Sequence, residues 1–397
     1  MGSNDKSKTG QRVTRVMRLT RLAGMMAVGM MSFGAMSLAH ADDVRIGAAS
    51  PLTGPQAHYG ADFTNGLILA VEDFNASKPV IGGKPIRIIL DSEDDQADPR
   101  TATQVAQKLV DSGIKGMLGH FNSGTSIPAS RIYAQAGIPQ ISMATAPEYT
   151  TQGFKTTFRM MTSDIQQGAV DGAFVVKNLK FNRVAIIDDR TAYGQGLADQ
   201  FEKAAKAAGA KIVDREYTND KAIDFRSILT KIKSSRPQAI FYGGADAQAA
   251  PMVKQMHSLG ITATLIGGEM VKTPTFLTIA GATGNGTVAS LAGLPLADMP
   301  GGAKYVAEYK KRFGSDVQTY SPYAYDGAMA MFTAMKNADS TEPSKYLPFL
   351  AKIKMAGVTT PELEYDARGD LKNGGITMYK VVNGEWTVLQ SVGGTHK

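Results

Sequence analysis

The stretch that decides the fold is residues 111–147, which reads DSGIKGMLGHFNSGTSIPASRIYAQAGIPQISMATAP. Gly113 ends a helical segment, and the apolar run Lys115–Gly119 follows it as a short strand. A small polar loop leads into a helix that begins near Ile127, and the apolar run Ile138–Ser142 forms the next strand. A strand, a helix and a second strand in this order predict a parallel sheet flanked by helices.

The same alternation continues on both sides of this stretch. Further strands are expected at Val44–Ser50, Ile86–Leu90, Val184–Ile187, Ile240–Tyr242 and Leu265–Gly267. Apolar residues recur on one helical face at Phe63, Leu67, Ala70, Val71 and Phe74. Asp98-Pro99 starts another helix, since Asp caps a helix and Pro suits its first turn. The fold class is therefore α/β, with parallel sheets and helices on both faces.

Two such sheets are expected, because 397 residues are too many for one ordinary core. The break between them lies near Phe158–Asp164, where a helix opens and a new strand–helix series follows. At the other end of the chain, Met378–Val382 and Trp386–Leu389 flank Asn383-Gly384, which predicts a hairpin with a type I′ turn.

The first 41 residues predict a secretory signal peptide. They combine a basic start, an uncharged apolar run from Leu22 to Ala39 and the small-x-small motif Ala39-His40-Ala41. The alternative is a membrane anchor, but the run is rich in Gly, Ala and Ser and ends at the motif. Cleavage is expected after Ala41, and the absence of cysteine excludes a lipoprotein. The mature protein is therefore expected in the periplasm.

Composition excludes several classes of function. Residues 1–41 hold six basic residues and one acidic residue, so the net charge of +7 falls to +2 without them, and no nucleic acid partner is expected. The chain has no cysteine for a thiolate metal site, and its histidines lack zinc-ligand spacing. No phosphate-binding loop or dinucleotide fingerprint is present. We therefore expect no cofactor, no metal and no enzymatic activity.

Candidate ligand-binding residues follow the ends of the predicted strands, where open α/β sheets bind ligands. Ser123 and Thr125 lie at a helix start, where backbone N–H groups and the helix dipole favour a carboxylate, although plain helix capping also explains them. Thr145 either bonds a ligand or closes a turn. Glu269, after two glycines, either pairs an ammonium group or is a solvated loop acid, and Asp246 carries the same ambiguity.

Two other groups of residues are open to interpretation. Tyr59, Tyr193 and Tyr323 either wall an apolar pocket or pack in the core. The acidic run Glu93-Asp94-Asp95 with Asp98 lacks the spacing of a known calcium loop, so a solvated loop and a helix cap are expected there.

Taken together, the segments resemble the branched-chain amino-acid (Leu/Ile/Val-type) periplasmic binding proteins of ABC transporters. The resemblance runs in order along the whole mature chain. It is carried by Ile46-Gly47, Pro51-Leu52-Thr53-Gly54-Pro55, Tyr59-Gly60, Asn65-Gly66, Asp94-Asp95, Asp98-Pro99, Gly119-His120, Pro128-Ala129-Ser130, Thr145-Ala146-Pro147-Glu148, Tyr193-Gly194-Gln195-Gly196-Leu197-Ala198, Asp224-Phe225, Tyr242-Gly243-Gly244, Gly268-Glu269 and Gly369-Asp370-Leu371.

The resemblance implies two Rossmann-like lobes hinged by three crossovers, with the ligand in the cleft. The lobes would comprise residues 42–163 with 292–373, and 164–291 with 374–397. It implies that Ser123 and Thr145, with backbone groups near Ala144, hold the carboxylate, and that Glu269 and Tyr193 hold the ammonium group. Tyr59 and Tyr323 match aromatic positions of the side-chain pocket.

This sequence departs from the family in two places. Ala245-Asp246 stands where members that bind leucine or valine often have an aromatic residue, which permits a ligand with a polar or cationic tail. Ala97 and Asn122 stand where some members have a disulfide. Asn122 and Asp246 are also among the expected ligand-binding residues.

The expected function is the substrate-binding component of an ABC importer, a monomer that captures an amino acid or similar small molecule and delivers it to a permease. The alternatives are a receptor for a carboxylate without an α-amino group, such as an aromatic acid, a receptor for a short amide, and a ligand sensor without a transport role.

Overall fold

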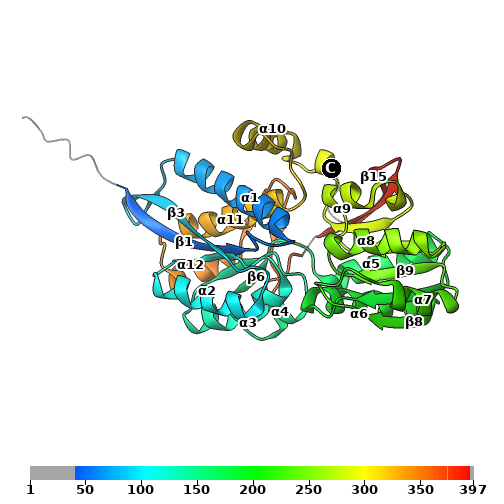
Figure 1. The fold of residues 1–397 in the computed structure, drawn as a ribbon. Coiled ribbons are helices and arrows are strands. Elements are labelled where there is room, and N and C mark those ends of the chain that lie inside the picture. The colour runs from blue at the N-terminus through cyan, green and yellow to red at the C-terminus, as the bar shows by residue number, and fades with distance from the viewer. Residues whose placement is uncertain (1–40, 373, 394–397) are drawn as a thin grey trace, which may run out of the picture. The chain divides into compact units, whose positions relative to one another are not determined.

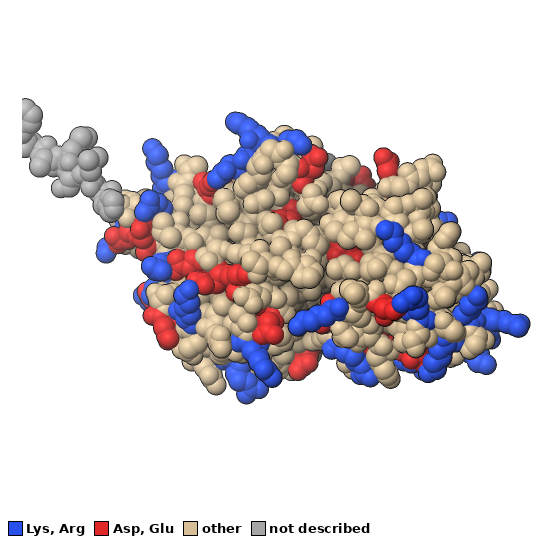
Figure 2. All heavy atoms as spheres, in the orientation of Figure 1, with Lys and Arg blue, Asp and Glu red and all other residues tan. Residues whose placement is uncertain are grey.

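The computed structural model describes residues 41–372 and 374–393. The predicted signal peptide lies outside this range, apart from Ala41 at its end. Within the described residues, no helix is long and apolar enough to cross a bilayer. Acidic and basic side chains are interspersed over the face of the molecule in Figure 2.

The first sheet is built around β1 (Asp42–Ser50) and has the strand order β2-β3-β1-β4-β5-β6. All its pairings are parallel except the first, in which β2 runs antiparallel to β3. The other strands are β2 (Val80–Ile81), β3 (Lys84–Asp94), β4 (Met117–Gly119), β5 (Gln140–Ser142) and β6 (Thr157–Arg159).

Helices cover both faces of this sheet (Figure 1). Alternate residues of β1 point to opposite faces, so Ile46 packs in one core and Ala49 in another. The core around Ile46 includes residues of α1 (Ala57–Ala76), α11 (Ser321–Asn337) and α12 (Pro343–Leu350). The core around Ala49 includes residues of α2 (Pro99–Asp111) and α3 (Ser123–Gln135). Asp98 caps α2 through the backbone N–H groups of Arg100 and Thr101, as predicted.

The second sheet has the strand order β15-β14-β11-β10-β9-β7-β8. Strands β7 to β11 pair in parallel, and the C-terminal hairpin joins them antiparallel. Asn383 and Gly384 have φ values of 53° and 80° at its turn, which confirms the predicted hairpin. The strands are β7 (Arg183–Asp188), β8 (Lys211–Tyr217), β9 (Ala239–Gly243), β10 (Thr264–Gly267), β11 (Val288–Ala292), β14 (Gly375–Val382) and β15 (Glu385–Gly393).

Helices also cover both faces of the second sheet. One face packs against α5 (Asp164–Lys177) and α6 (Ala192–Ala207), and the other against α7 (Arg226–Ser234), α8 (Asp246–Ser258) and α9 (Pro274–Ala280). The chain leaves the first sheet after β6, returns to its helices after β11, and enters the second sheet again at β14. The remaining elements are α4 (Glu148–Thr151), α10 (Gly302–Phe313), β12 (Lys354–Met355), β13 (Leu363–Glu364) and two short 3-10 turns, η1 (Gly281–Gly284) and η2 (Leu296–Asp298). The predicted α/β class is confirmed.

The acidic loop differs from the expectation in one respect. Asp98 caps its helix and Asp94 accepts hydrogen bonds from Leu52 and Thr53. Asp95, however, is fully buried, and its Oδ2 lies 2.8 Å from Nδ1 of His120. The expected solvated loop is wrong for this residue, because a histidine 25 positions later in the chain folds against it.

Candidate functional site

A small cavity lies where strand ends of the two sheets face each other. It encloses about 10 Å³, roughly the space that one water molecule needs. An amino acid can therefore enter only if the lining side chains or the two lobes move apart. The lining residues are Phe121, Asn122, Ser123, Met143, Thr145, Tyr193, Glu269, Met270 and Tyr320.

Ser123 and Thr145 line the wall that the first sheet contributes. Ser123 is the first residue of α3, so its side chain sits at the positive end of the helix dipole. Its Oγ accepts hydrogen bonds from the backbone N–H groups of Thr145 (3.3 Å) and Ala146 (3.2 Å). These bonds join the loops that follow β4 and β5 and leave the Ser123 hydroxyl proton to be donated. This wall is suited to an anion such as a carboxylate.

Ala144 lies beside this wall, and its backbone N–H and carbonyl groups already have hydrogen-bond partners within the protein. Its N–H donates to Ser142 Oγ at 2.9 Å, and its carbonyl accepts from Arg159 at 2.5 Å. Arg159 is fully buried and also donates to the Ala146 carbonyl and to Asp370. The guanidinium therefore fixes the loop after β5. In this arrangement the Ala144 backbone is not available to a ligand carboxylate.

Glu269 and Tyr193 form the opposite wall. Glu269 follows β10, is 3% exposed, and its Oε2 has no hydrogen-bond partner among the described residues. Burial raises the pKa of Glu269. Tyr193, near the start of α6, is 5% exposed, and its hydroxyl is also unpartnered within the described chain. The wall offers acceptors to a cation.

Sequence reasoning missed a buried acidic stripe behind this wall. Asp164, Gln167 and Asp171 lie on one face of α5 and are fully buried. Neither carboxylate oxygen of Asp164 has a partner in the described part of the chain. Burial, and then the charge of Glu269, raise the pKa of Asp164. The spacing of these polar residues along a helix was the available signal, because a buried helix face is normally apolar.

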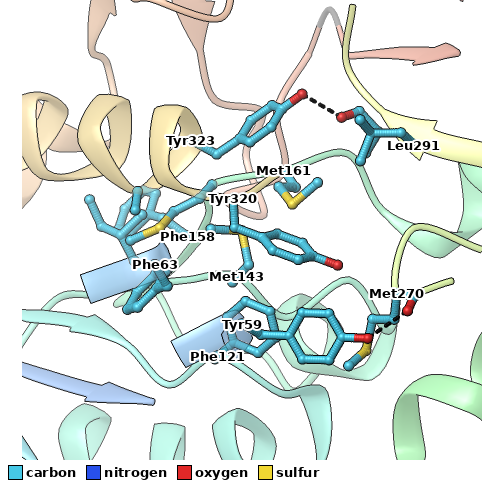
Figure 3. Packing of buried hydrophobic residues seen from close by; sticks show 14 of the residues in the cluster. Tyr59, Phe63, Phe121, Met143, Phe158, Met161, Met270, Leu291, Tyr320 and Tyr323 are labelled. Atoms are coloured by element: carbon cyan, nitrogen blue, oxygen red, sulfur yellow. Dashed lines mark hydrogen bonds between the residues drawn. The ribbon is translucent and has the colours of Figure 1, made fainter. Parts of the chain in front are cut away.

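The aromatic lining differs from the expected set. Tyr320 lines the cavity and meets Phe121 edge to face at 4.8 Å. Tyr323, three residues later, lies elsewhere: its hydroxyl donates to the Ala292 carbonyl, beside Met161 (Figure 3). Tyr323 was the expected pocket residue and Tyr320 was not singled out. The orientation of α11 and of Tyr320, the residue that precedes it, decides which of the two reaches the cavity.

Tyr59, in α1 beside the first sheet, and Asp246, at the start of α8 beside the second sheet, meet each other outside the cavity wall. The Tyr59 hydroxyl donates to the Met270 carbonyl at 2.6 Å (Figure 3). Asp246 is fully buried, accepts a 2.6 Å hydrogen bond from Thr273, and lies 2.9 Å from Nε2 of His58. We call these contacts of His58 and Tyr59 with Asp246 and Met270 the interlobe clasp. Sequence reasoning did not single out His58.

The cavity therefore places hydroxyl and helix-terminal donors opposite buried carboxylate acceptors. Such an arrangement is complementary to a molecule with an anionic and a cationic group close together. Within the described ranges, no three or more His, Cys, Asp or Glu side chains are grouped so that they could hold a metal ion.

Comparison with known proteins shows the family to which this chain belongs. A family model for a periplasmic binding protein matches residues 43–385. A Leu/Ile/Val-binding protein homolog 1 of Brucella suis biovar 1 is 34% identical over 365 residues, which cover 92% of this chain and 96% of that protein. A leucine-, isoleucine-, valine-, threonine- and alanine-binding protein of Pseudomonas aeruginosa is 31% identical and covers 91% and 95% of the two chains.

Solved structures share the fold. A leucine-binding protein LivK from Thermotoga maritima superposes with a TM-score of 0.82 at 24% identity and covers 88% of this chain and 98% of its own. A solute-binding protein from R. palustris in complex with benzoate gives a TM-score of 0.79 at 18% identity, with 89% and 98% covered.

The family consists of solute-binding proteins rather than enzymes, and its members work in the periplasm. Both the family match and the relatives extend along nearly all of the described residues. This chain belongs to the periplasmic binding protein family and is similar to Leu/Ile/Val-binding proteins within it.

Proposed function

We propose that this protein is the substrate-binding component of an ABC importer and that it captures an α-amino acid. The observation that carries the proposal is the pairing of walls in the cavity. Ser123 and Thr145 would hold the carboxylate, and Glu269 and Tyr193 would hold the ammonium group. The unpartnered oxygen of Glu269 supports this assignment, because a buried acceptor without a donor is costly unless a ligand satisfies it.

Asp164 would assist from behind the Glu269 wall. A bound ammonium group favours the ionised forms of both carboxylates, which burial disfavours in the absence of a cation. The positive charge of the ligand therefore offsets the free-energy cost of burying the two ionised carboxylates. Because the ligand makes this contact only in the closed arrangement, its binding favours closure.

Capture would proceed by lobe closure. The carboxylate would bind first to the lobe of residues 42–163 and 292–373, and the lobe of residues 164–291 and 374–397 would then close over the ammonium group. Exclusion of water strengthens both sets of contacts. We further propose that the signal peptide is cleaved after Ala41 and that the monomeric mature protein delivers its ligand to a membrane permease.

Isothermal titration calorimetry of residues 42–397 against the twenty amino acids, GABA, short amides and benzoate tests the proposal. Glu269→Gln should weaken amino-acid binding at least tenfold, the equivalent of about 1.4 kcal/mol. Glu308→Gln, on the surface of α10, is the matched control and should leave affinity unchanged. Binding of benzoate or amides without any α-amino acid would refute the ammonium site. Unchanged affinity in Glu269→Gln would also refute it.

A further inference from the structure

A second, larger cavity continues from the candidate site. It measures about 440 Å³, and Asn122, Tyr193 and Met270 line both cavities. A ligand fixed by its α-amino and carboxylate groups in the small cavity would therefore extend its side chain into the large one. The other walls of the large cavity include Gln56, Ala97, Asp189, Arg190, Asp220 and Ala245.

The entrance to the large cavity is polar and rich in acceptors. The Asn122 amide donates to Gln56 Oε1 at 2.7 Å, while its own Oδ1 is buried and has no partner within the described residues. The side chains of Ala97 and Ala245 are small and do not narrow the large cavity. An aliphatic side chain would leave the buried Asn122 oxygen without a hydrogen bond, which is unfavourable.

Two carboxylates lie farther along the cavity. Asp189 is 4% exposed, and one of its oxygens accepts hydrogen bonds from the backbone and hydroxyl of Thr191. Asp220 is half-buried, and its carboxylate makes no hydrogen bond to the described part of the chain. Burial, opposed by the Thr191 bonds and reinforced by the charge of Asp220, raises the pKa of Asp189 to about 6. The two acids thus share one environment in which a cation would be favoured.

A buried hydroxyl adjoins the same carboxylates. Tyr242 is fully buried, and its hydroxyl has no partner among the residues described. A Cβ atom at Gly244 would lie 2.3 Å from that hydroxyl and 2.8 Å from Asp189 Oδ2, so both atoms converge over the bare glycine. The charges of Asp189 and Asp220 both raise the pKa of Tyr242, after burial itself.

Arg190, the basic residue of the cavity wall, does not neutralise the carboxylates of Asp189 and Asp220. The Arg190 guanidinium stacks on the Tyr217 ring at 3.4 Å and lies 3.9 Å from Asp188. Its side chain is 48% exposed. The charge of Arg190 is therefore directed to Tyr217 and Asp188.

We propose that the ligand is an α-amino acid whose long side chain ends in a cation, of the lysine, ornithine or arginine class, with that cation held between Asp189 and Asp220. The inference rests on the proposed amino-acid-binding function and adds the nature of the side chain. It distinguishes this protein from its relatives named for leucine, isoleucine and valine.

Calorimetry with L-lysine, L-ornithine, L-arginine, L-leucine, L-glutamine and L-glutamate tests the inference. At least one basic amino acid should bind tenfold or more tightly than L-leucine and L-glutamine. Asp220→Asn should weaken that binding at least fivefold while changing L-alanine binding by less than twofold. Asp199→Asn, an exposed acid of the same lobe, controls for the long-range effect of one charge and should change neither.

The outcomes separate the two proposals. Binding of L-leucine or L-glutamine in preference to all basic amino acids would overturn the cationic side chain and leave the amino-acid receptor standing. If Asp220→Asn weakened the binding of L-lysine and of L-alanine by the same factor, Asp220 would have only a structural role and the proposed cation subsite would be refuted. Absence of binding by every α-amino acid would overturn both proposals.

Discussion

Replacing His58 by Phe removes the polar contact of the interlobe clasp while keeping its packing. His58 Nε2 lies 2.9 Å from Asp246 Oδ2, and their side chains are 27% and 0% exposed. The His58 ring also packs on Tyr59 with a centroid separation of 3.9 Å, which a Phe ring can reproduce. Among the described residues, Asp246 would then retain the Thr273 hydroxyl as its side-chain donor.

The magnitude follows from the nature of this contact. A hydrogen bond to a charged group contributes about 1.5–3 kcal/mol, and the partial exposure of His58 favours the lower end. Because the bond joins the two lobes, it forms only when they approach. A loss of about 1.5 kcal/mol would lower the ratio of closed to open protein roughly tenfold. Ligand affinity would fall by the same factor when the free protein is mostly open.

Calorimetry with the amino acid that binds the wild-type protein measures the affinity, and small-angle X-ray scattering of the ligand-free protein measures closure. His257→Phe, at the exposed end of α8, is the matched control. The double variant His58→Phe/Asp246→Asn should lose little more ligand affinity than either single variant. If the two single losses simply add, or if His58→Phe leaves both affinity and scattering unchanged, the clasp reasoning is refuted.

Two further predictions concern stability. Arg159→Met should lower the free energy of unfolding by about 3–5 kcal/mol, because it leaves Asp370 and two carbonyls without their buried cationic donor; urea unfolding measures this, and a loss below 1 kcal/mol would contradict it. Burial raises the pKa of Asp326 to about 6, so the folded state favours the protonated form. Its contribution is therefore greatest below about pH 4 and declines by about 3 kcal/mol as pH rises to 6. Asp326→Asn should remove this decline in urea unfolding, and parallel pH curves for the two proteins would contradict the assignment.

The elements that the sequence predicted well are those with strong local signals. Asp98-Pro99 starts α2, and Asn383-Gly384 forms the hairpin turn, because each signal acts within a few residues. Strands β8 and β11 were not predicted. Strand β8 lies at the edge of its sheet, partly exposed and with charged residues, so it lacks the apolar run of a central strand. Strand β11 is a short run of mostly small residues between Asn285-Gly286 and Gly293, and these turn signals were overlooked.

In the candidate site, too, local sequence signals predicted some residues and only the tertiary structure determined the others. The sequence by itself placed Ser123, Thr145 and Glu269 at strand ends, and parallel strands bring Ser123 and Thr145 to one edge of the first sheet. Glu269 follows a strand of the second sheet, and it meets the other two because the strand ends of the two sheets face each other. Only the tertiary structure decided that Tyr320 rather than Tyr323 lines the cavity, that Asp246 pairs with His58, and that Asp164 stands behind Glu269. These outcomes depend on helix rotation and on the approach of segments up to 188 residues apart. Local sequence periodicity carries no information about either.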